Sequence, residues 1–144
     1  MSRQSPAAGR VAGVDFGTVR IGIAISDADR KIASPLENYT RRGTEQDARW
    51  FQRLVDEHEV VLFVVGLPLH MDGRESEKSL EARRFGDWLA ETTGVPIEYF
   101  DERLTSHEAE RLLIDAELTH KRRKKRLDML AAQIILRGYL QNDE

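Results

Sequence analysis

Apolar residues along this chain change their spacing from strand-like to helix-like and back, and these changes divide the chain into elements. Residues 11–16 and 20–26 are rich in β-branched side chains, and they flank residues 17–19, which contain a glycine. This pattern predicts two strands joined by a glycine-assisted hairpin. A third strand is expected near residues 31–36. The chain therefore begins with an antiparallel meander, and residues 1–10 before it are expected to form a disordered tail.

Further along, the apolar positions alternate between helical and strand spacing. Residues 44–59 show a helical stripe behind Thr44, which predicts an amphipathic helix capped by that threonine. Residues 60–66 are continuously apolar, as expected of a central strand covered on both faces. A second helix is predicted over residues 77–93, with Gly94 as its stop signal. The side chains expected to be buried on this second helix are Leu80, Phe85, Trp88 and Leu89.

The last third of the chain adds one strand and more helix. Residues 96–100 predict a strand, and Thr105 and Glu108 have the spacing of a capping box for a following helix. A last helix is expected to run through Leu140. Three strands in a meander, then helix, strand, helix, strand and helices, describe an α/β fold: a five-stranded mixed sheet flanked by helices. With no repeat and no linker, residues 11–144 are expected to form a single domain.

Composition narrows the chemistry. The 144 residues include no cysteine, which excludes disulfides, zinc-thiolate sites and thiol nucleophiles. The formal net charge of −3 argues against wholesale wrapping of nucleic acid and leaves room for a local basic patch. The longest apolar runs have the length of a strand, and the first residues lack the apolar core of a secretory signal. We therefore expect a cytoplasmic protein that does not enter a membrane.

Four acidic side chains stand in or beside apolar segments. Asp15 lies in the first strand, Asp101 and Glu102 end a later strand, and Asp128 falls on the apolar side of the last helix when residues are placed about 100° apart. Such acids repel one another unless a cation lies between them. Mg²⁺ and Mn²⁺ prefer oxygen ligands, and a divalent cation held by carboxylates suits phosphodiester hydrolysis. The acids therefore predict a metal site.

Each acid also has a structural explanation. Asp15 could accept backbone hydrogen bonds in the glycine turn, because buried charges are paired or bind metal. Asp128 could pair with an arginine such as Arg103, since structural ion pairs also perturb acids. Each signal alone is weak, and it is their coincidence in one α/β sheet that favours the metal site.

Positive charge is concentrated at residues 120–126, "HKRRKKR", directly before the helix that carries Asp128. Basic runs are often solvated, but this position favours a mobile loop that holds a polyanionic backbone with salt-dependent, largely sequence-blind affinity. Arg20 and Arg103 lie close to candidate ligands, so either could grip the scissile phosphate or pair with the acids. The candidates for substrate binding are Thr18, Arg20, Arg103, Lys121, Arg122, Arg123, Lys124, Lys125 and Arg126.

Four segments, in this order along the chain, carry a family resemblance: "GVDFGTVRIGIAISD", "VVGLPLHMDG", "DERLTSHEA" and "KRLDMLAAQIIL". Together they span essentially the whole chain after the tail, and the sequence closely resembles the YqgF family, also called RuvX, of ribonuclease H-like nucleases. The resemblance implies a ribonuclease H-like sheet, a cytoplasmic protein and the family's assigned role as a pre-16S ribosomal RNA nuclease acting in 5′-end maturation.

The same resemblance implies roles for the acids. Asp15 matches the metal ligand of the first strand, Asp101 or Glu102 the middle acid, and Asp128 the acid of the C-terminal helix. Many proteins of the wider superfamily place the second acid on the fourth strand, where this chain has Gly66 between two apolar residues. The resemblance therefore implies that the metal site is completed from Asp101 or Glu102.

Other functions stay open at this point. A Holliday junction resolvase would use the same chemistry to cut branched DNA as a homodimer, whereas RNA processing would tolerate a monomer. The letters "DFGT" also resemble the phosphate-binding hairpin of actin-like ATPases, but those proteins clasp nucleotide between two such domains. A non-catalytic module could bind ribosomal particles or nucleic acid through the basic run alone. The expected partner is thus precursor ribosomal RNA, branched DNA or a ribosomal particle.

Overall fold

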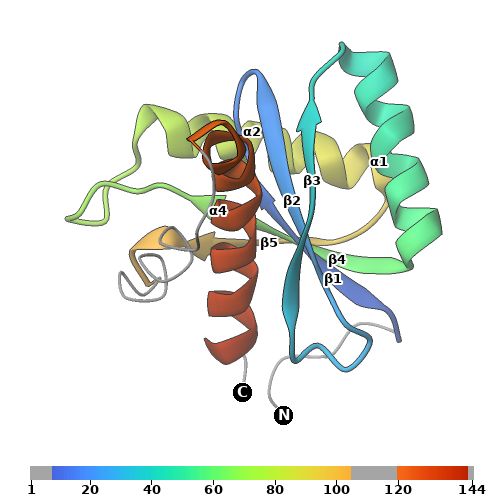
Figure 1. Cartoon of the computed structure of the whole chain (residues 1–144). Coiled ribbons are helices and arrows are strands. Elements are labelled where there is room, and N and C mark those ends of the chain that lie inside the picture. Colours follow the sequence, from blue (N-terminus) through green and yellow to red (C-terminus); the bar gives the residue numbers. More distant parts are fainter. Residues whose placement is uncertain (1–7, 105–119, 143–144) are drawn as a thin grey trace.

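A five-stranded sheet forms the centre of the protein (Figure 1). The computed structural model describes residues 8–104 and 120–142, with side chains described up to residue 104 and from 129 to 141. The strand order is β3-β2-β1-β4-β5. The strands are β1 (Arg10–Asp15), β2 (Arg20–Ser26), β3 (Ala33–Thr40), β4 (Val60–Leu67) and β5 (Ile97–Asp101). The predicted five-stranded α/β architecture is confirmed.

The sheet is mixed. Strands β1, β2 and β3 form the antiparallel meander, in which Asp15 pairs with Gly22. Strand β4 runs parallel to β1, with Val14 opposite Val65, and β5 runs parallel to β4 with Leu67 opposite Asp101. The carboxyl ends of β1, β4 and β5 therefore meet at one edge of the sheet, together with the turn between β1 and β2.

Helices cover both faces of this sheet (Figure 1). Helices α1 (Thr44–His58) and α2 (Glu77–Thr93) pack on one face, and α4 (His120–Asn142) crosses the other. A short 3-10 turn, η1 (Glu102–Leu104), follows β5 directly. Within the described part of the chain, no helix is both long and apolar enough to cross a membrane.

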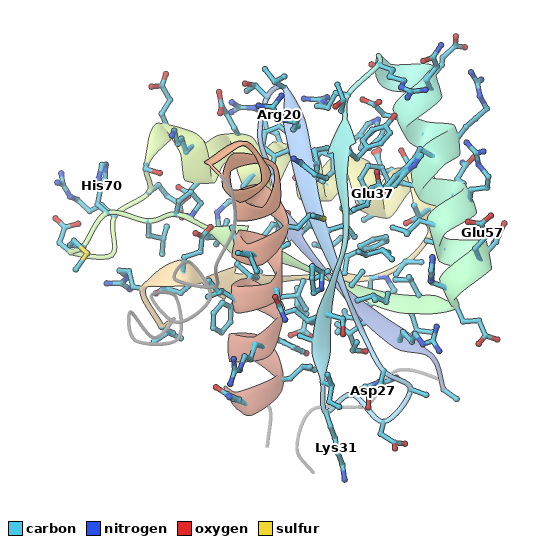
Figure 2. All side chains as sticks on the ribbon, in the orientation of Figure 1. Arg20, Asp27, Lys31, Glu37, Glu57 and His70 are labelled. Carbon is cyan, nitrogen blue, oxygen red and sulfur yellow. The ribbon has the colours of Figure 1, made fainter. Side chains whose placement is uncertain are left out.

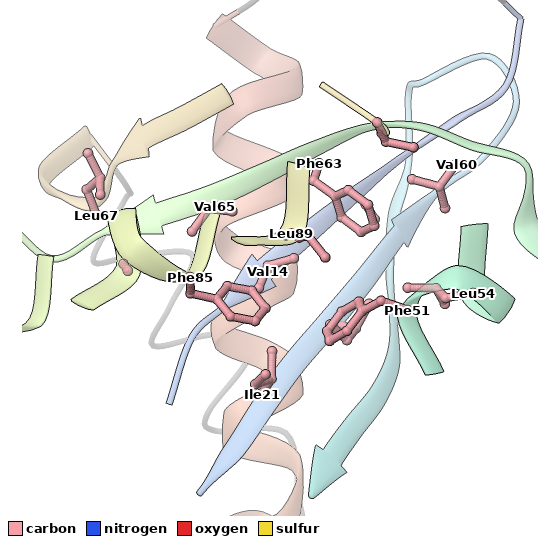
Figure 3. Close-up of a cluster of buried hydrophobic side chains, with 14 residues drawn as sticks. Val14, Ile21, Phe51, Leu54, Val60, Phe63, Val65, Leu67, Phe85 and Leu89 are labelled. Carbon is pink, nitrogen blue, oxygen red and sulfur yellow. The ribbon is translucent and has the colours of Figure 1, made fainter. Parts of the chain in front are cut away.

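Three phenylalanine rings lie among aliphatic side chains in the core between the sheet and helices α1 and α2 (Figure 3). The Phe51 ring is fully buried, and its centroid lies 6.2 Å from that of Phe63 and 5.7 Å from that of Phe85. Both contacts are edge-on, the arrangement that aromatic pairs favour. This cluster fixes the two helices against β1 and β4.

The core under α4 is closely packed and mostly aliphatic, with Phe100 and Tyr139 as its rings. Val11 and Val64 from the sheet meet Ala132, Ile135 and Leu136 from the helix. At Gly13 a methyl group would lie 2.7 Å from Leu136 Cβ and 2.9 Å from the Ala132 carbonyl oxygen. Helix α4 therefore rests almost directly on the backbone of β1, which only a glycine at this position allows.

Two details of α1 and β3 differ from expectation. The N-cap of α1 is Gly43, with φ of 114°, and Thr44 is the first helical residue without a capping hydrogen bond. Glycine adopts this positive φ without strain, so the cap needs no side chain. Strand β3 covers Ala33–Thr40 and not residues 31–36, because it pairs with β2 along the whole length of that strand.

Helices α2 and α4 and the start of β1 also differ in part from what the sequence predicts. Helix α2 has the predicted bounds and ends at Gly94 with φ of 73°, but Leu80 is 44 % exposed because Ser79 takes the inward position of that turn. Residues 120–126 form the first turns of α4 and not a loop, consistent with the good helix propensity of Lys and Arg. Strand β1 already begins at Arg10. Residues 1–7 of the expected tail and the helix predicted behind Thr105 lie outside the described residues.

Candidate active site

The edge where β1, β4 and β5 end carries the first candidate acid. Asp15 is the last residue of β1, and Gly66 lies beside it in β4 because Val14 pairs with Val65. Alternate residues of a strand point to the same face, so Asp15 shares the face of Gly13, which contacts α4. Gly66 faces the same helix, since a methyl group there would lie 2.5 Å from Ile135 Cδ1.

Glu102 reaches the same place from the end of β5. A methyl group on Gly66 would lie 2.7 Å from Glu102 Oε2, so this carboxylate occupies the space in front of the glycine. Gly66 thus provides the room in which the Glu102 carboxylate approaches the end of β1. The structure therefore brings two of the four predicted acids, Asp15 and Glu102, to the α4 face of one sheet edge.

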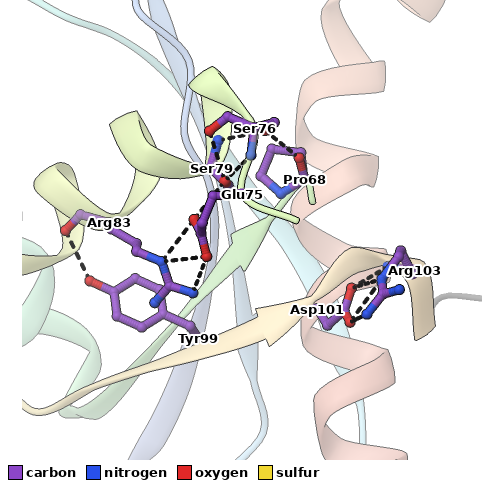
Figure 4. A network of polar contacts seen from close by, with 8 residues as sticks. All are labelled: Pro68, Glu75, Ser76, Ser79, Arg83, Tyr99, Asp101 and Arg103. Carbon is purple, nitrogen blue, oxygen red and sulfur yellow. Dashed lines mark hydrogen bonds and ion pairs between the residues drawn. The ribbon is translucent and has the colours of Figure 1, made fainter. Parts of the chain in front are cut away.

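Asp101 lies on the opposite face and has a different partner. Phe100 packs under α4 against Gly138, so its neighbour Asp101 points toward the α2 side. Its carboxylate accepts hydrogen bonds from Arg103 Nη2 at 2.6 Å, Arg103 Nε at 3.1 Å and the Arg103 backbone N–H at 2.9 Å (Figure 4). These bonds from Arg103 hold the pKa of Asp101 below its usual range.

Arg103 also connects two segments beside the site. Besides the ion pair with Asp101, its Nη1 donates a hydrogen bond to the Met71 carbonyl oxygen at 3.0 Å. Of the two roles that the sequence left open for Arg103, the structure shows pairing with an acid. The arginine thereby ties residues 68–73, which follow β4, to the end of β5.

The same stretch is anchored to the start of α2 (Figure 4). The Ser76 hydroxyl donates to the Pro68 carbonyl oxygen at 2.6 Å and accepts from the Ser79 backbone N–H at 2.9 Å. Ser79 completes a capping box, a device that satisfies two otherwise unpaired N–H groups. The loop that follows Gly66 is thus held at both ends next to the acids.

The fourth acid and most of the basic run lie outside the described side chains. Asp128 belongs to α4, one helical turn before the buried Ala132, and its side chain is not described. The same holds for Lys121, Arg122, Arg123, Lys124, Lys125 and Arg126. Among the described residues no group of three His, Asp or Glu side chains forms a metal cluster. The three-acid site stays a prediction, with two of its members located.

Two other substrate-binding candidates lie at the same edge. Thr18 and Arg20 are both exposed in and after the turn between β1 and β2, only three and five positions beyond Asp15. Figure 2 shows Arg20 at the end of the sheet where the β1–β2 turn lies, opposite the end that carries Asp27 and Lys31. Their position is compatible with a phosphate at Asp15.

Sequence reasoning missed one buried acid. Asp47 in α1 is 1 % exposed and accepts hydrogen bonds from the Tyr39 hydroxyl at 2.6 Å and the Arg42 backbone N–H at 2.9 Å. Burial raises the pKa of its carboxyl, but the bonds from Tyr39, Arg42 and Arg41 outweigh burial and lower it. Its position on the buried side of α1, four residues before Phe51, was the available signal.

Comparison with known proteins places the chain in a family. The family model of RuvX, described as Holliday junction resolvase, matches residues 9–142. The chain belongs to the RuvX family. It is 48 % identical over 136 residues to a protein of Rhodopirellula baltica named "Putative pre-16S rRNA nuclease". The aligned residues cover 94 % of this chain and 79 % of that relative. A RuvX relative of the same name from Halothermothrix orenii is 41 % identical over 131 residues, covering 91 % of this chain and 94 % of the relative.

Two resolvases are among the solved structures that this chain resembles. This RuvX chain superposes on RuvC of Thermus thermophilus in complex with a Holliday junction substrate with a TM-score of 0.58 at 15 % identity, covering 93 % of this chain and 96 % of the other. The Fowlpox virus resolvase in its complex with Holliday junction DNA gives 0.58 at 11 % identity, covering 92 % and 97 %. At such identities the likeness concerns the fold alone, and it confirms the ribonuclease H-like fold.

Proposed function

We propose that this RuvX protein is a nuclease that hydrolyses phosphodiester bonds of precursor 16S ribosomal RNA, with Mg²⁺ or Mn²⁺ held by Asp15, Glu102 and Asp128. The observation that carries the proposal is that the Glu102 carboxylate lies in front of Gly66, the residue beside Asp15 in the sheet, on the face that Asp15 shares. The names of the relatives supply the substrate class.

The donor set fits the proposed metals. Carboxylate oxygens are the ligands that hard divalent cations prefer, and a site with two or three of them leaves coordination positions for water and phosphate. The space in front of Gly66, which a side chain would fill, is the feature of this chain that admits the Glu102 carboxylate. When bound, the metal lowers the pKa of an attacking water and stabilises the departing oxygen.

The protein's own groups bind and orient. In the proposal, Asp15 at the end of β1 and Glu102 directly after β5 hold the cation, so the spacing of these strand ends sets their separation. Thr18, in the adjoining turn, and Arg20, the first residue of β2, hold the phosphate on the solvent side. Arg103 is committed to Asp101 and Met71, and it therefore positions the β5 end that carries Glu102.

Asp101 takes a different role in this proposal from the one predicted for it. The sequence left Asp101 and Glu102 as alternatives for the middle acid. Asp101 is paired with Arg103 and points toward the α2 side of the sheet, away from the face that Asp15 and Glu102 share. These two features favour Glu102 as the ligand. We therefore assign Asp101 as a positioning residue, which acts on the site through Arg103.

Cleavage of a precursor 16S RNA fragment with Mg²⁺ or Mn²⁺ tests these roles. Asp15→Asn and Glu102→Gln are each expected to lower the cleavage rate about 1,000-fold, because each removes a charge that stabilises the transition state. Asp101→Asn is expected to cost about tenfold, the size of an outer-shell effect. Asp56→Asn, an exposed acid on α1, is the matched control and should cleave at the wild-type rate.

Two results would contradict the assignment. Full activity of Glu102→Gln with strong loss in Asp101→Asn would reverse the roles of the two acids. If the wild-type protein cleaves no nucleic acid with either metal but binds it, the protein is a non-catalytic binding module. Asp15→Asn should then bind with unchanged affinity.

Branched DNA is a second candidate substrate, favoured by the family description and by the fold shared with the resolvases. A four-way DNA junction in the same assay decides between the two. Paired symmetric nicks by a homodimer would establish resolvase action, whereas cleavage of precursor RNA by a monomer would establish the processing role. A cytoplasmic location and contact with ribosomal particles belong to the RNA proposal.

A further inference from the structure

A hollow of about 290 Å³ lies just beyond the candidate active site, on the other face of the sheet. Phe16 and Thr18 line it, and Phe16 directly follows Asp15 in the chain. The Phe16 ring packs against the core under α1 and α2, whereas Asp15 shares the α4 face with Gly13. The two side chains therefore lie on opposite sides of the same sheet edge. We call this hollow the aromatic pocket.

Ring faces form the apolar part of the aromatic pocket. The Phe16 and Phe85 rings are stacked, with centroids 4.8 Å apart and planes 28° apart. Trp88, also in the lining, lies 5.6 Å from Phe85 at 35°. Phe85 is anchored in the core that Figure 3 shows, so this stack is a fixed surface and not a loose flap. Flat apolar walls of this kind suit a flat apolar ligand.

The charged groups of the lining are two arginines and one glutamate. The Arg41 guanidinium carbon lies 5.3 Å from the centroid of the Phe16 ring, and Arg84 from α2 is exposed at the border of the pocket. Glu81 is the one acid of the lining and can accept hydrogen bonds from amino groups. Arginine planes and aromatic rings together are the surfaces on which unpaired nucleobases stack.

A second hollow of about 240 Å³ continues the positive surface along α1. Arg42, Arg49 and Arg53 line it beside Trp50, whose ring stacks on Tyr39 at 4.3 Å, and its lining contains no acid. Within the described residues these three arginines form no salt bridge, and all three are exposed. Because Arg41 lines the first hollow and its neighbour Arg42 lines the second, the two hollows adjoin. We call Arg42, which lies just before α1, and Arg49 and Arg53, which lie on it, the α1 arginines.

We propose that the aromatic pocket binds one unpaired nucleobase of the substrate strand, next to the nucleotide held at Asp15, and that the α1 arginines hold phosphates of the strand beyond it. This inference rests on the proposed nuclease function and deepens it, because it assigns a single-stranded arm to the substrate. Charge complementarity argues for a polyanion here. Arg41 is already paired with Asp47, but Arg84 and the α1 arginines form no salt bridge among the described residues, and an apolar peptide would leave these positive charges without partners.

The two tryptophans of the chain make the pocket directly observable, because Trp88 lines the first hollow and Trp50 the second. Protein with the Asp15→Asn change is labelled with 5-fluorotryptophan, and its two ¹⁹F lines are assigned with Trp88→Phe and Trp50→Phe variants. A single-stranded oligoribonucleotide is expected to shift the Trp88 line, and a blunt duplex of the same sequence should not. Fluorescence anisotropy reports the affinity of each oligonucleotide in parallel.

A cycle of variants and abasic oligonucleotides then locates the base. Replacing one nucleotide of the strand by an abasic one is expected to weaken binding about tenfold, the usual size of one base stacked on an aromatic ring. Trp88→Leu should cost a similar factor, and the two losses should not add. Arg84→Ala should weaken single-strand binding about threefold, while Lys78→Ala, an exposed cation of the same helix outside both hollows, should change nothing.

The outcomes separate the two proposals. Tight binding of the oligonucleotide with an unmoved Trp88 line, or additive losses in the cycle, overturns the base pocket and leaves the nuclease proposal intact. Absence of any nucleic-acid binding overturns both. A Trp88 line that shifts with protein concentration alone identifies the aromatic pocket as a contact between two copies of the chain, and this too overturns the proposal.

Discussion

The two faces of the sheet are built from different side chains. On the face under α1 and α2, the Phe51 ring contacts the Phe63 and Phe85 rings at the centre of an otherwise aliphatic core. On the face under α4, where the rings are Phe100 and Tyr139, the helix lies so close to the sheet that a methyl group at Gly13 or Gly66 has no room. The face under α1 and α2 therefore buries a cluster of large side chains, which we call the aromatic face. The face under α4 lets a helix approach the sheet backbone closely, and we call it the glycine face.

This difference separates stability from chemistry. Burying a large ring removes much apolar surface from water, so the aromatic face carries more of the folding free energy per residue. The glycine face brings Glu102 against the end of β1, and that approach is what the proposed metal site needs. A change on the aromatic face should thus unfold the protein, and a change at the end of the glycine face should disable it while it stays folded.

Loss of the central ring is expected to have the largest effect. Phe51→Ala should lower the free energy of unfolding by about 4 kcal/mol, because it removes a fully buried ring and leaves a cavity between the sheet and α1. Urea denaturation measures this loss, and Phe51→Leu should lose only about 1 kcal/mol. Cleavage per folded molecule should be unchanged in both; a tenfold drop there would show that the two faces are not separable.

A methyl group in the middle of the glycine face comes next. Gly13→Ala is expected to cost about 3 kcal/mol, since its methyl would lie 2.9 Å from the Ala132 carbonyl oxygen, a backbone atom that cannot turn away. Thermal and urea unfolding give the loss. A change within about 0.5 kcal/mol would mean that α4 does not press on β1 as described.

The same substitution at the site end should act on cleavage instead. Gly66→Ala is expected to lower kcat/KM about 30-fold, because its methyl displaces Glu102 Oε2, with less than about 2 kcal/mol lost in stability. Adding Ile135→Val removes the other crowded atom, Ile135 Cδ1. The double variant should regain stability without regaining cleavage. Recovery of both would mean that Ile135, and not Glu102, causes the defect.

The smallest effect concerns the Tyr39 hydroxyl on the aromatic face. Burial, followed by the hydrogen bond to Asp47, raises the pKa of Tyr39 from 10.0 to about 12. Because the folded state holds this proton more tightly, the corresponding stability is complete below pH 10 and is lost as pH rises toward 12. Tyr39→Phe should cost about 1 kcal/mol at pH 7 and remove this loss, as measured by urea unfolding at each pH. Tyr99→Phe, which keeps the Tyr39–Asp47 pair, should retain it.

Periodicity and turn residues were sufficient to predict most of the fold. The hairpin at residues 17–19, the interior position of β4 and both ends of α2 follow from local patterns that packing does not override. The strand at the centre of the sheet is β1 and not the predicted β4. The misses have tertiary causes. The full length of β3 depends on its partner β2. Ser79 faces inward because its hydroxyl accepts a hydrogen bond from the Ser76 backbone N–H, and the Ser76 hydroxyl in turn donates to the Pro68 carbonyl oxygen of the loop after β4.

The site was predictable only in part. Spacing and composition singled out Asp15, Asp101 and Glu102, but they could not tell which of two adjacent acids faces Asp15. That answer depends on which face of β5 packs under α4, and on the space at Gly66 in a strand thirty-six residues earlier. The aromatic pocket joins residues from the turn after β1, the start of α1 and α2, so the sequence pattern of no single segment predicts it.

The position of α4 at the end of the chain has a consequence for folding during translation. Strands β1, β2 and β3 are complete at Thr40, yet the helix that covers their aliphatic face begins only at His120. A nascent chain must therefore carry that face uncovered through most of its synthesis, a state prone to association with other chains. It also means that Asp15, made among the first residues, meets the helix of Asp128 only at the end. The chain is thus expected to become a nuclease in one late step, with no partly active form during translation.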